Sequence, residues 1–238
     1  GAILACELTC SWELPPAMLI EILSDTICPW CFIGKKRLEK ALAMRPTVEY
    51  ELQWRPYQLN PTMPAEGVDR YGYLTARFGT IDRAERNQES IRQAGVEEGI
   101  GFRFDRILRT PNSINSHRLI RHAQNAGLQE AVVESLYRAY FLDGQDIGNV
   151  GILADVGASH GMDRDDLLAY LASDRDRSQI QSEDEQARQL GVTGVPCYVI
   201  EDQYAVSGAQ SPEVFVQIID LVRQEEQELA EMRAAAAE

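Results

Sequence analysis

Two cysteines separated by a proline and a tryptophan, Cys28 and Cys31, stand between a strand-like run and a helix-like run. The run before them, MLIEILS from Met18 to Ser24, is short and rich in Ile and Leu, which predicts a strand. From Pro29 onward apolar residues recur at helical spacing, and a proline suits the first helical turn because its missing N–H costs nothing there. The alternating run from Thr47 to Trp54 predicts a second strand. This order is a βαβ unit, which favours a right-handed crossover and a parallel strand pair.

The rest of the chain is mostly helical until β character returns near the carboxyl end, and the last helix of this region is predicted from Glu183 to Leu190, where Gly191 stops it. Short apolar runs at Pro196–Ile200 and Tyr204–Gly208, joined by a turn, predict a hairpin. Ser211 and Pro212 then cap a final helix. The two β-rich ends would share one sheet, so the fold class is α/β with a large helical insertion. The expected division is a tag or extension (1–17), a βαβ half (18–62), a helical lobe (63–190), a ββα half (191–223) and a helical or frayed tail (224–238).

The net charge, the hydropathy and the first 17 residues limit which partners and which cell compartment are expected for this protein. A formal net charge of −14 repels phosphate backbones, which argues against nucleic acid as a partner. No apolar run approaches the roughly 20 residues that span a bilayer, so no membrane association is expected. Residues 1–17 contain no basic residue and no long apolar centre, unlike a secretory signal. We expect a tag, scar or extension before Met18 and a cytoplasmic protein, although a signal removed before Gly1 would leave no trace.

The spacing of Cys28 and Cys31 is compatible with three uses of the pair. A zinc site of four cysteines would have to include Cys6 and Cys10, the only nearby partners in a chain of five cysteines. An inert structural disulfide is the second use. A redox-active dithiol is the third, and it is favoured because the pair opens a helix within a βαβ unit. No metal is therefore expected.

The position of the pair also assigns the two sulfurs different roles. Unpaired N–H groups at a helix N-terminus stabilise a thiolate, so Cys28 is expected to attack the substrate. Cys31, one turn further along, is expected to resolve the resulting mixed disulfide. Between them Pro29 stiffens the turn, and Trp30 tunes the pair without adding charge.

Three further polar residues are candidates for a role in the site. Glu21, on a strand face with Leu19 and Leu23, is either a carboxylate beneath the dithiol that shuttles a proton or a solvated acid. Asp25 is expected to be a turn residue, and His117 is expected on the exposed face of a helix.

Several motifs resemble a known family. The pattern S-D-x-x-C-P-W-C-x-x-G, followed by a basic helix, is similar to the thioredoxin-fold DsbA superfamily. Within it the chain resembles the FrnE-like branch, which is related to 2-hydroxychromene-2-carboxylate isomerases and kappa-type glutathione transferases. The resemblance runs from about Met18 to about Val222 and rests on the stretches WRPYQLNP, PNSINSHRL, GVTGVPCYVI and SGAQSPE.

This resemblance implies a thioredoxin-like fold with a large helical insertion. It also implies a cis Val195–Pro196 bond that faces the dithiol, with Val195 and Pro196 forming an edge on which a substrate peptide docks. Cys197 departs from the apolar, often aromatic, residue expected after that proline. It is either a small buried hydrophobe or a third redox thiol close to Cys28.

The function expected from these motifs is thiol–disulfide exchange with protein or small-molecule thiols. No metal or organic cofactor is required, and glutathione could serve as a co-substrate. One alternative is a glutathione-dependent isomerase or transferase acting on a small aromatic substrate, and another is a non-enzymatic peptide-binding or holdase module. The expected assembly is a monomer or a homodimer.

Overall fold

The computed structural model describes residues 17–236, in which a four-stranded sheet has the order β2-β1-β5-β6. Strand β1 (Met18–Ser24) runs parallel to β2 (Tyr50–Pro56) and antiparallel to β5 (Cys197–Ile200). Strand β5 in turn pairs antiparallel with β6 (Tyr204–Ser207). Strands from both ends of the chain therefore share one sheet, which confirms the α/β class.

Strand β1 is paired along both edges, and helices cover both of its faces. Ile20 and Ile22 belong to the main core, together with residues of α1 (Pro29–Ala43) and α9 (Pro212–Ala236). Leu23 points to the other face, where it packs with Cys197 and with Ala187 of α8 (Arg177–Gln189). Because the side chains of β1 alternate, a residue's position along β1 decides whether it faces the helix that carries the dithiol.

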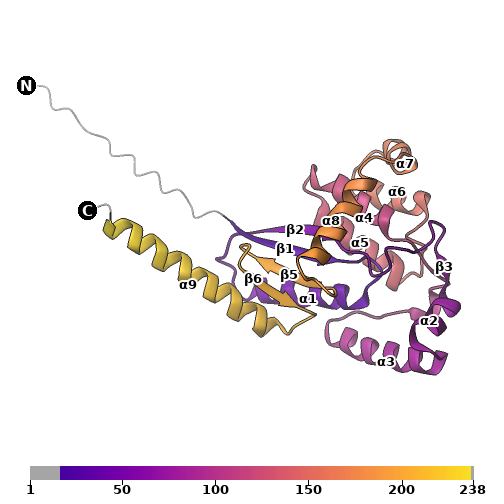
Figure 1. The fold of residues 1–238 in the computed structure, drawn as a ribbon, viewed down its shortest axis with the longest axis horizontal. Helices are drawn as coiled ribbons and strands as arrows, with labels where there is room; N and C mark the ends of the chain where they lie inside the picture. Colours follow the sequence, from indigo (N-terminus) through magenta and orange to yellow (C-terminus); the bar gives the residue numbers. More distant parts are fainter. Residues whose placement is uncertain (1–16, 237–238) are drawn as a thin grey trace, which may run out of the picture.

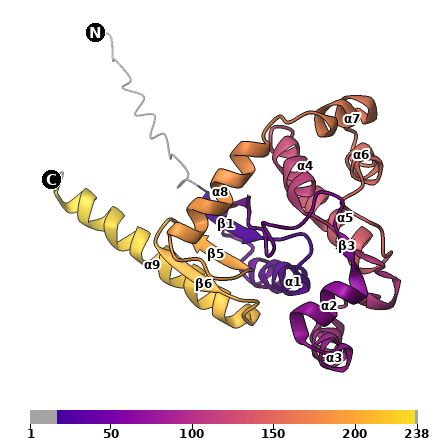
Figure 2. The same ribbon diagram turned by 45° about the vertical axis from the view of Figure 1, so that its right-hand side comes forward.

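Helix α8 covers the face of the sheet that carries Leu23, whereas α9 packs beside α1 on the other face, and its carboxyl-terminal part runs away from the sheet (Figures 1 and 2). None of the helices within residues 17–236 is long and apolar enough to cross a bilayer. The remaining elements are β3 (Val68–Asp69), α2 (Arg70–Phe78), α3 (Ile81–Glu97), the 3₁₀ turn η1 (Phe104–Arg106), β4 (Arg109–Thr110), α4 (Ile114–Gln124), α5 (Gln129–Phe141), α6 (Val150–Ala158) and α7 (Arg164–Ala172).

Two elements differ from the sequence prediction at their starts. The second strand begins at Tyr50 rather than Thr47, because the Val48 N–H donates back to the Arg45 carbonyl in the turn that follows α1. Helix α8 begins at Arg177 rather than Glu183. Its first turns carry one apolar side chain, Ile180, so the hydrophobic period is hidden in the sequence.

Candidate active site

The β1–α1 connection places Cys28 at the N-terminus of α1. Cys28 is the N-cap residue, with extended backbone angles (φ −94°, ψ 113°), and Pro29 takes the first helical position. The Cys31 N–H donates to the Cys28 carbonyl at 3.1 Å, which closes the first turn. Both cysteines are free thiols, with exposed fractions of 4% for Cys28 and 1% for Cys31. Cys28 is thus the more accessible sulfur, while Trp30 beside it is 36% exposed.

The loop before β5 lies against the dithiol. The Val195–Pro196 peptide bond is cis, and the Cys28 thiol donates to the Val195 carbonyl with a sulfur–oxygen distance of 3.6 Å. The Gly208 N–H donates to the Pro196 carbonyl at 2.8 Å, which ties this loop to the end of β6. The backbone of Val195 therefore faces the sulfur of Cys28.

Gly34, at the end of the C-P-W-C-x-x-G pattern, lets α1 approach this loop closely. A Cβ atom at position 34 would lie 2.2 Å from the Tyr198 hydroxyl oxygen and 3.1 Å from Cγ of Pro196. Since real Cβ contacts are not that short, a larger residue would push α1 away from β5 and from the loop before it. The glycine thus fixes the distance between the dithiol helix and Pro196.

The surroundings of Cys31 keep its proton in place. Burial raises the pKa of the Cys31 thiol well above its usual value, and the hydrogen bond and negative charge of Cys28 raise it further. The backbone of Asp25 lowers this pKa through a hydrogen bond, whereas the charge of the Asp25 carboxylate raises it. Cys31 is therefore a protonated thiol until a base accepts its proton.

Asp25 supplies a buried carboxylate next to this pair. The Asp25 backbone forms the expected turn, in which its carbonyl accepts from the Cys28 N–H at 3.0 Å. Its side chain is fully buried and accepts hydrogen bonds from the N–H groups of Ile27, at 3.3 Å, and Leu59, at 2.7 Å. The sequence contains no sign that this carboxylate is buried beside the cysteines, because a turn-forming aspartate is usually exposed.

His117 is not on a helix surface, and that prediction was wrong. Its side chain is buried, and Nε2 lies 3.6 Å from Oδ1 of Asp25. Helix α4, which carries His117, contacts α5, α6, α7, α8 and β2, so little of its surface is open to solvent. The structure therefore brings together Cys28, Cys31, Asp25 and His117.

Glu21 and Cys197 lie on the opposite face of the sheet from the dithiol. The Arg55 guanidinium donates to Oε1 of Glu21 at 2.7 Å. Glu21 and Cys197 line a cavity of about 470 Å³ between the sheet and α8, and burial raises the pKa of the Cys197 thiol. The carboxylate that faces the cysteines is that of Asp25 rather than that of Glu21.

The zinc alternative depends on Cys6 and Cys10, which lie outside the described residues. Within residues 17–236, no three or more His, Cys, Asp or Glu side chains are grouped so that they could hold a metal ion.

Comparison with known proteins places this site in a family. Residues 19–220 match the DSBA-like thioredoxin domain. The chain belongs to the DSBA-like thioredoxin family. This match confirms both the resemblance to the DsbA superfamily and the thioredoxin-like fold.

Solved structures of similar shape agree with the family. A probable DsbA oxidoreductase from Streptomyces coelicolor, SCO1869, is 32% identical, with a TM-score of 0.79 over 87% of this chain and 91% of that one. The cytosolic disulfide reductase DsbM from Pseudomonas aeruginosa, solved with GSH, is 17% identical, with a TM-score of 0.63 over 87% and 99% of the two chains. A 2-hydroxychromene-2-carboxylate isomerase is 15% identical, with a TM-score of 0.62 over 92% and 98%.

Proposed function

We propose that this protein exchanges disulfides with protein or small-molecule thiols through Cys28 and Cys31. The observation that carries the proposal is the position of Cys28, which caps α1 and faces the Val195 carbonyl while a protonated Cys31 lies beside it. Unpaired N–H groups at the helix N-terminus stabilise the thiolate of the attacking sulfur. Family membership supports the same chemistry.

Reduction of a substrate disulfide would take two steps. The Cys28 thiolate attacks one sulfur of the substrate disulfide, so one substrate thiolate leaves and a mixed disulfide forms. Cys31 then gives its proton to the Asp25 carboxylate, and its sulfur attacks that of Cys28. The bond between Cys28 and the substrate breaks, the Cys28–Cys31 disulfide forms, and the second substrate thiolate leaves. Two electrons have passed to the substrate, and the same steps in reverse oxidise a dithiol.

The loop before β5 is proposed to hold the substrate. An extended peptide could pair with the backbone of Val195 beside Pro196, as an added strand pairs with a sheet edge. Because the Val195 carbonyl already lies 3.6 Å from the Cys28 sulfur, a peptide there would bring its own sulfur to the attacking atom. Trp30, partly exposed beside Cys28, offers an apolar contact to the same substrate.

Glutathione is proposed as a co-substrate, and the solved structure of the similar DsbM with GSH supports it. The likeness to a 2-hydroxychromene-2-carboxylate isomerase favours a second candidate, a glutathione-dependent isomerase or transferase. The presence of both Cys28 and Cys31 favours dithiol chemistry over that candidate. Electron flow depends on the reduction potential of the pair relative to its compartment, so a titration against glutathione buffers will give the direction.

An insulin-reduction assay tests the proposal. Wild-type protein should reduce insulin, Cys28→Ser should lose this activity, and Cys31→Ser should accumulate a mixed disulfide at Cys28 that mass spectrometry detects. Equal turnover in wild type and Cys28→Ser would refute the proposal. If neither turns over and both suppress insulin aggregation equally, the protein is a holdase instead.

Asp25→Asn tests the base in the second step. The amide keeps the shape of the side chain but cannot accept the proton, so release of the second substrate thiolate should slow by about a hundredfold while Cys28 still attacks at its normal rate. If the second thiolate leaves as fast as from wild type, Asp25 is not the base.

A further inference from the structure

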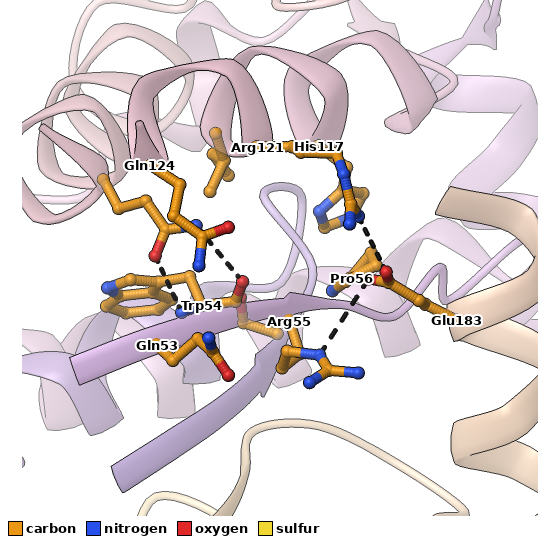
Figure 3. Close-up of a pocket in the computed structure, with 11 residues that line it drawn as sticks. Gln53, Trp54, Arg55, Pro56, His117, Arg121, Gln124 and Glu183 are labelled. Carbon is orange, nitrogen blue, oxygen red and sulfur yellow. Dashed lines mark hydrogen bonds and ion pairs between the residues drawn. The ribbon is translucent and has the colours of Figure 1, made fainter. Parts of the chain in front are cut away.

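A small polar cavity lies beside His117. Figure 3 shows His117, Arg121 and Gln124 of α4 above it, with Arg55 of β2 below and Glu183 of α8 at one side. Its volume is about 130 Å³. A cavity of this size with polar walls has room for several water molecules, since one water needs roughly 10–15 Å³ by this measure.

His117 is the residue that connects this cavity with Asp25. The imidazole lines the cavity, and its Nε2 lies 3.6 Å from the Asp25 carboxylate. His117 is 3% exposed, and its buried Nε2 has no hydrogen-bond partner among residues 17–236. A buried polar atom of this kind calls for an explanation, because leaving it unpaired costs about 1–3 kcal/mol. Contact with a carboxylate that gains and loses a proton is such an explanation.

We propose that His117 passes the proton of Cys31 from Asp25 to water in this cavity. The inference rests on the proposed function, because it concerns the step in which Cys31 attacks the mixed disulfide. Asp25 is fully buried, so a proton that it accepts has no direct path to solvent. His117 acts through Asp25 and is therefore a positioning residue for this proton.

The step balances as a transfer within a closed set of groups. Asp25 accepts the proton of Cys31, His117 accepts it from Asp25 at Nε2, and the imidazole releases a proton from its other nitrogen to cavity water. No electrons move in this relay; they move when the Cys31 sulfur displaces the substrate sulfur. Reduction of the Cys28–Cys31 disulfide by a dithiol uses the same path inward.

The charged groups around His117 do not close the cavity off from solvent. Besides Asp25, they are Arg121 on α4 itself, Arg55 on β2 and Glu183 on α8. Arg121 donates to Glu183 at 2.8 Å, and Nε of Arg55 lies 3.9 Å from the same carboxylate. These three side chains are partly exposed, at 25%, 37% and 14%, so the cavity meets solvent between them.

Single-turnover kinetics with a small aromatic disulfide test the relay. With enzyme in excess, the first coloured thiolate reports attack by Cys28, and the second reports displacement by Cys31. In His117→Ala the second phase should slow about tenfold while the first is unchanged. Added imidazole, which fits the space left beside the cavity, should restore the second phase. His122→Ala is the matched control, because His122 lies on the same helix but packs against Tyr170, and both phases should stay at wild-type rates.

The possible outcomes separate the relay from the proposed function. A second phase in His117→Ala that equals the wild-type rate would overturn the relay. So would a slower phase that imidazole does not restore, because it would indicate a purely structural role. His117→Gln, which keeps a polar side chain in the buried site, should remain slow and guards against misfolding of the alanine variant. If wild-type protein releases no first thiolate, the proposed function itself has failed.

Discussion

Arg118 should contribute unusually strongly to the stability of the helical insertion. It lies on α4 next to His117 and is fully buried. Its guanidinium stands 4.9 Å from the centre of the Tyr170 ring and also donates to the side chain of Asn115 at 2.9 Å. The other contacts are four carbonyls at and after the end of α7, all at 2.7–3.0 Å: those of Tyr170, Leu171, Ser173 and Arg175. Two of these carbonyls, those of Tyr170 and Leu171, lie in the last turn of α7, where a helix leaves its carbonyls without partners of its own.

Replacing Arg118 with Met keeps much of its length and removes all of these donors. Each buried carbonyl left without a donor costs about 1–3 kcal/mol. Part of this loss is offset, because burial lowers the pKa of Arg118 and so shows that the charge is itself costly to bury. The expected net loss is about 3–5 kcal/mol, which is typical when one partner of a buried charged network is removed.

Thermal unfolding monitored by circular dichroism will measure this loss. For a chain of this size each kcal/mol lowers the melting temperature by about 2–4 °C, so Arg118→Met should lower it by roughly 6–20 °C. Arg138→Met is the control, since that side chain is 59% exposed and lies 3.9 Å from Glu134, a surface pair worth at most about 1 kcal/mol. An equal loss of a few degrees in both variants would contradict this role of Arg118.

Three further predictions concern the site and the stability of the fold at low pH. Gly34→Ala places a methyl group against the Tyr198 hydroxyl. The rate of disulfide reduction should fall, and the free energy of unfolding should decrease by roughly 1–3 kcal/mol. An unchanged rate and melting temperature would contradict the tight contact. An oxidised Cys31→Ser variant should contain no disulfide to Cys197, which faces the other side of the sheet, and peptide mass mapping would detect one. Burial alone would raise the pKa of Glu98, but Lys40 and Arg37 lower it, and the net pKa lies below the usual value. The ionised carboxylate therefore stabilises the fold at pH values above its unfolded pKa. This contribution is lost as the pH falls below about 4. Glu98→Gln should flatten the acid limb of a stability–pH curve, and an unaltered limb would count against these partners, Lys40 and Arg37.

The dithiol was predictable from the sequence because the signals that define it are local. The strand prediction from Met18 to Ser24 matches β1, and Pro29 begins α1 as its position suggested. Strand end, N-cap cysteine and first-turn proline are neighbours along the chain, so no distant contact is needed to place them. The shared sheet was predictable for a related reason, since two β-rich ends that flank a helical region need a common partner.

The acid beside the dithiol was not predictable in the same way, although strand alternation contained part of the answer. Ile20 and Ile22 face α1, so Glu21 between them must face the other side of the sheet. Asp25 comes after the strand has ended, where alternation no longer applies. Its direction is set by the N–H group of Leu59, a residue far along the chain that only the folded β2 connection brings near.

The burial of His117 and Arg118 has the same cause and a larger consequence. Neighbouring positions on a helix point in directions about 100° apart, so two adjacent polar residues span a wide part of the helix surface. Such a pair normally indicates that this part of the helix is exposed. Here α4 is enclosed on several sides, and each polar side chain is matched by a group from another segment: the Asp25 carboxylate for His117 and the end of α7 for Arg118. Arg118 therefore holds the end of α7 against α4, and α4 holds His117 against Asp25. In this arrangement the insertion covers one side of the sheet and also supplies the buried residue that meets the carboxylate beside the dithiol.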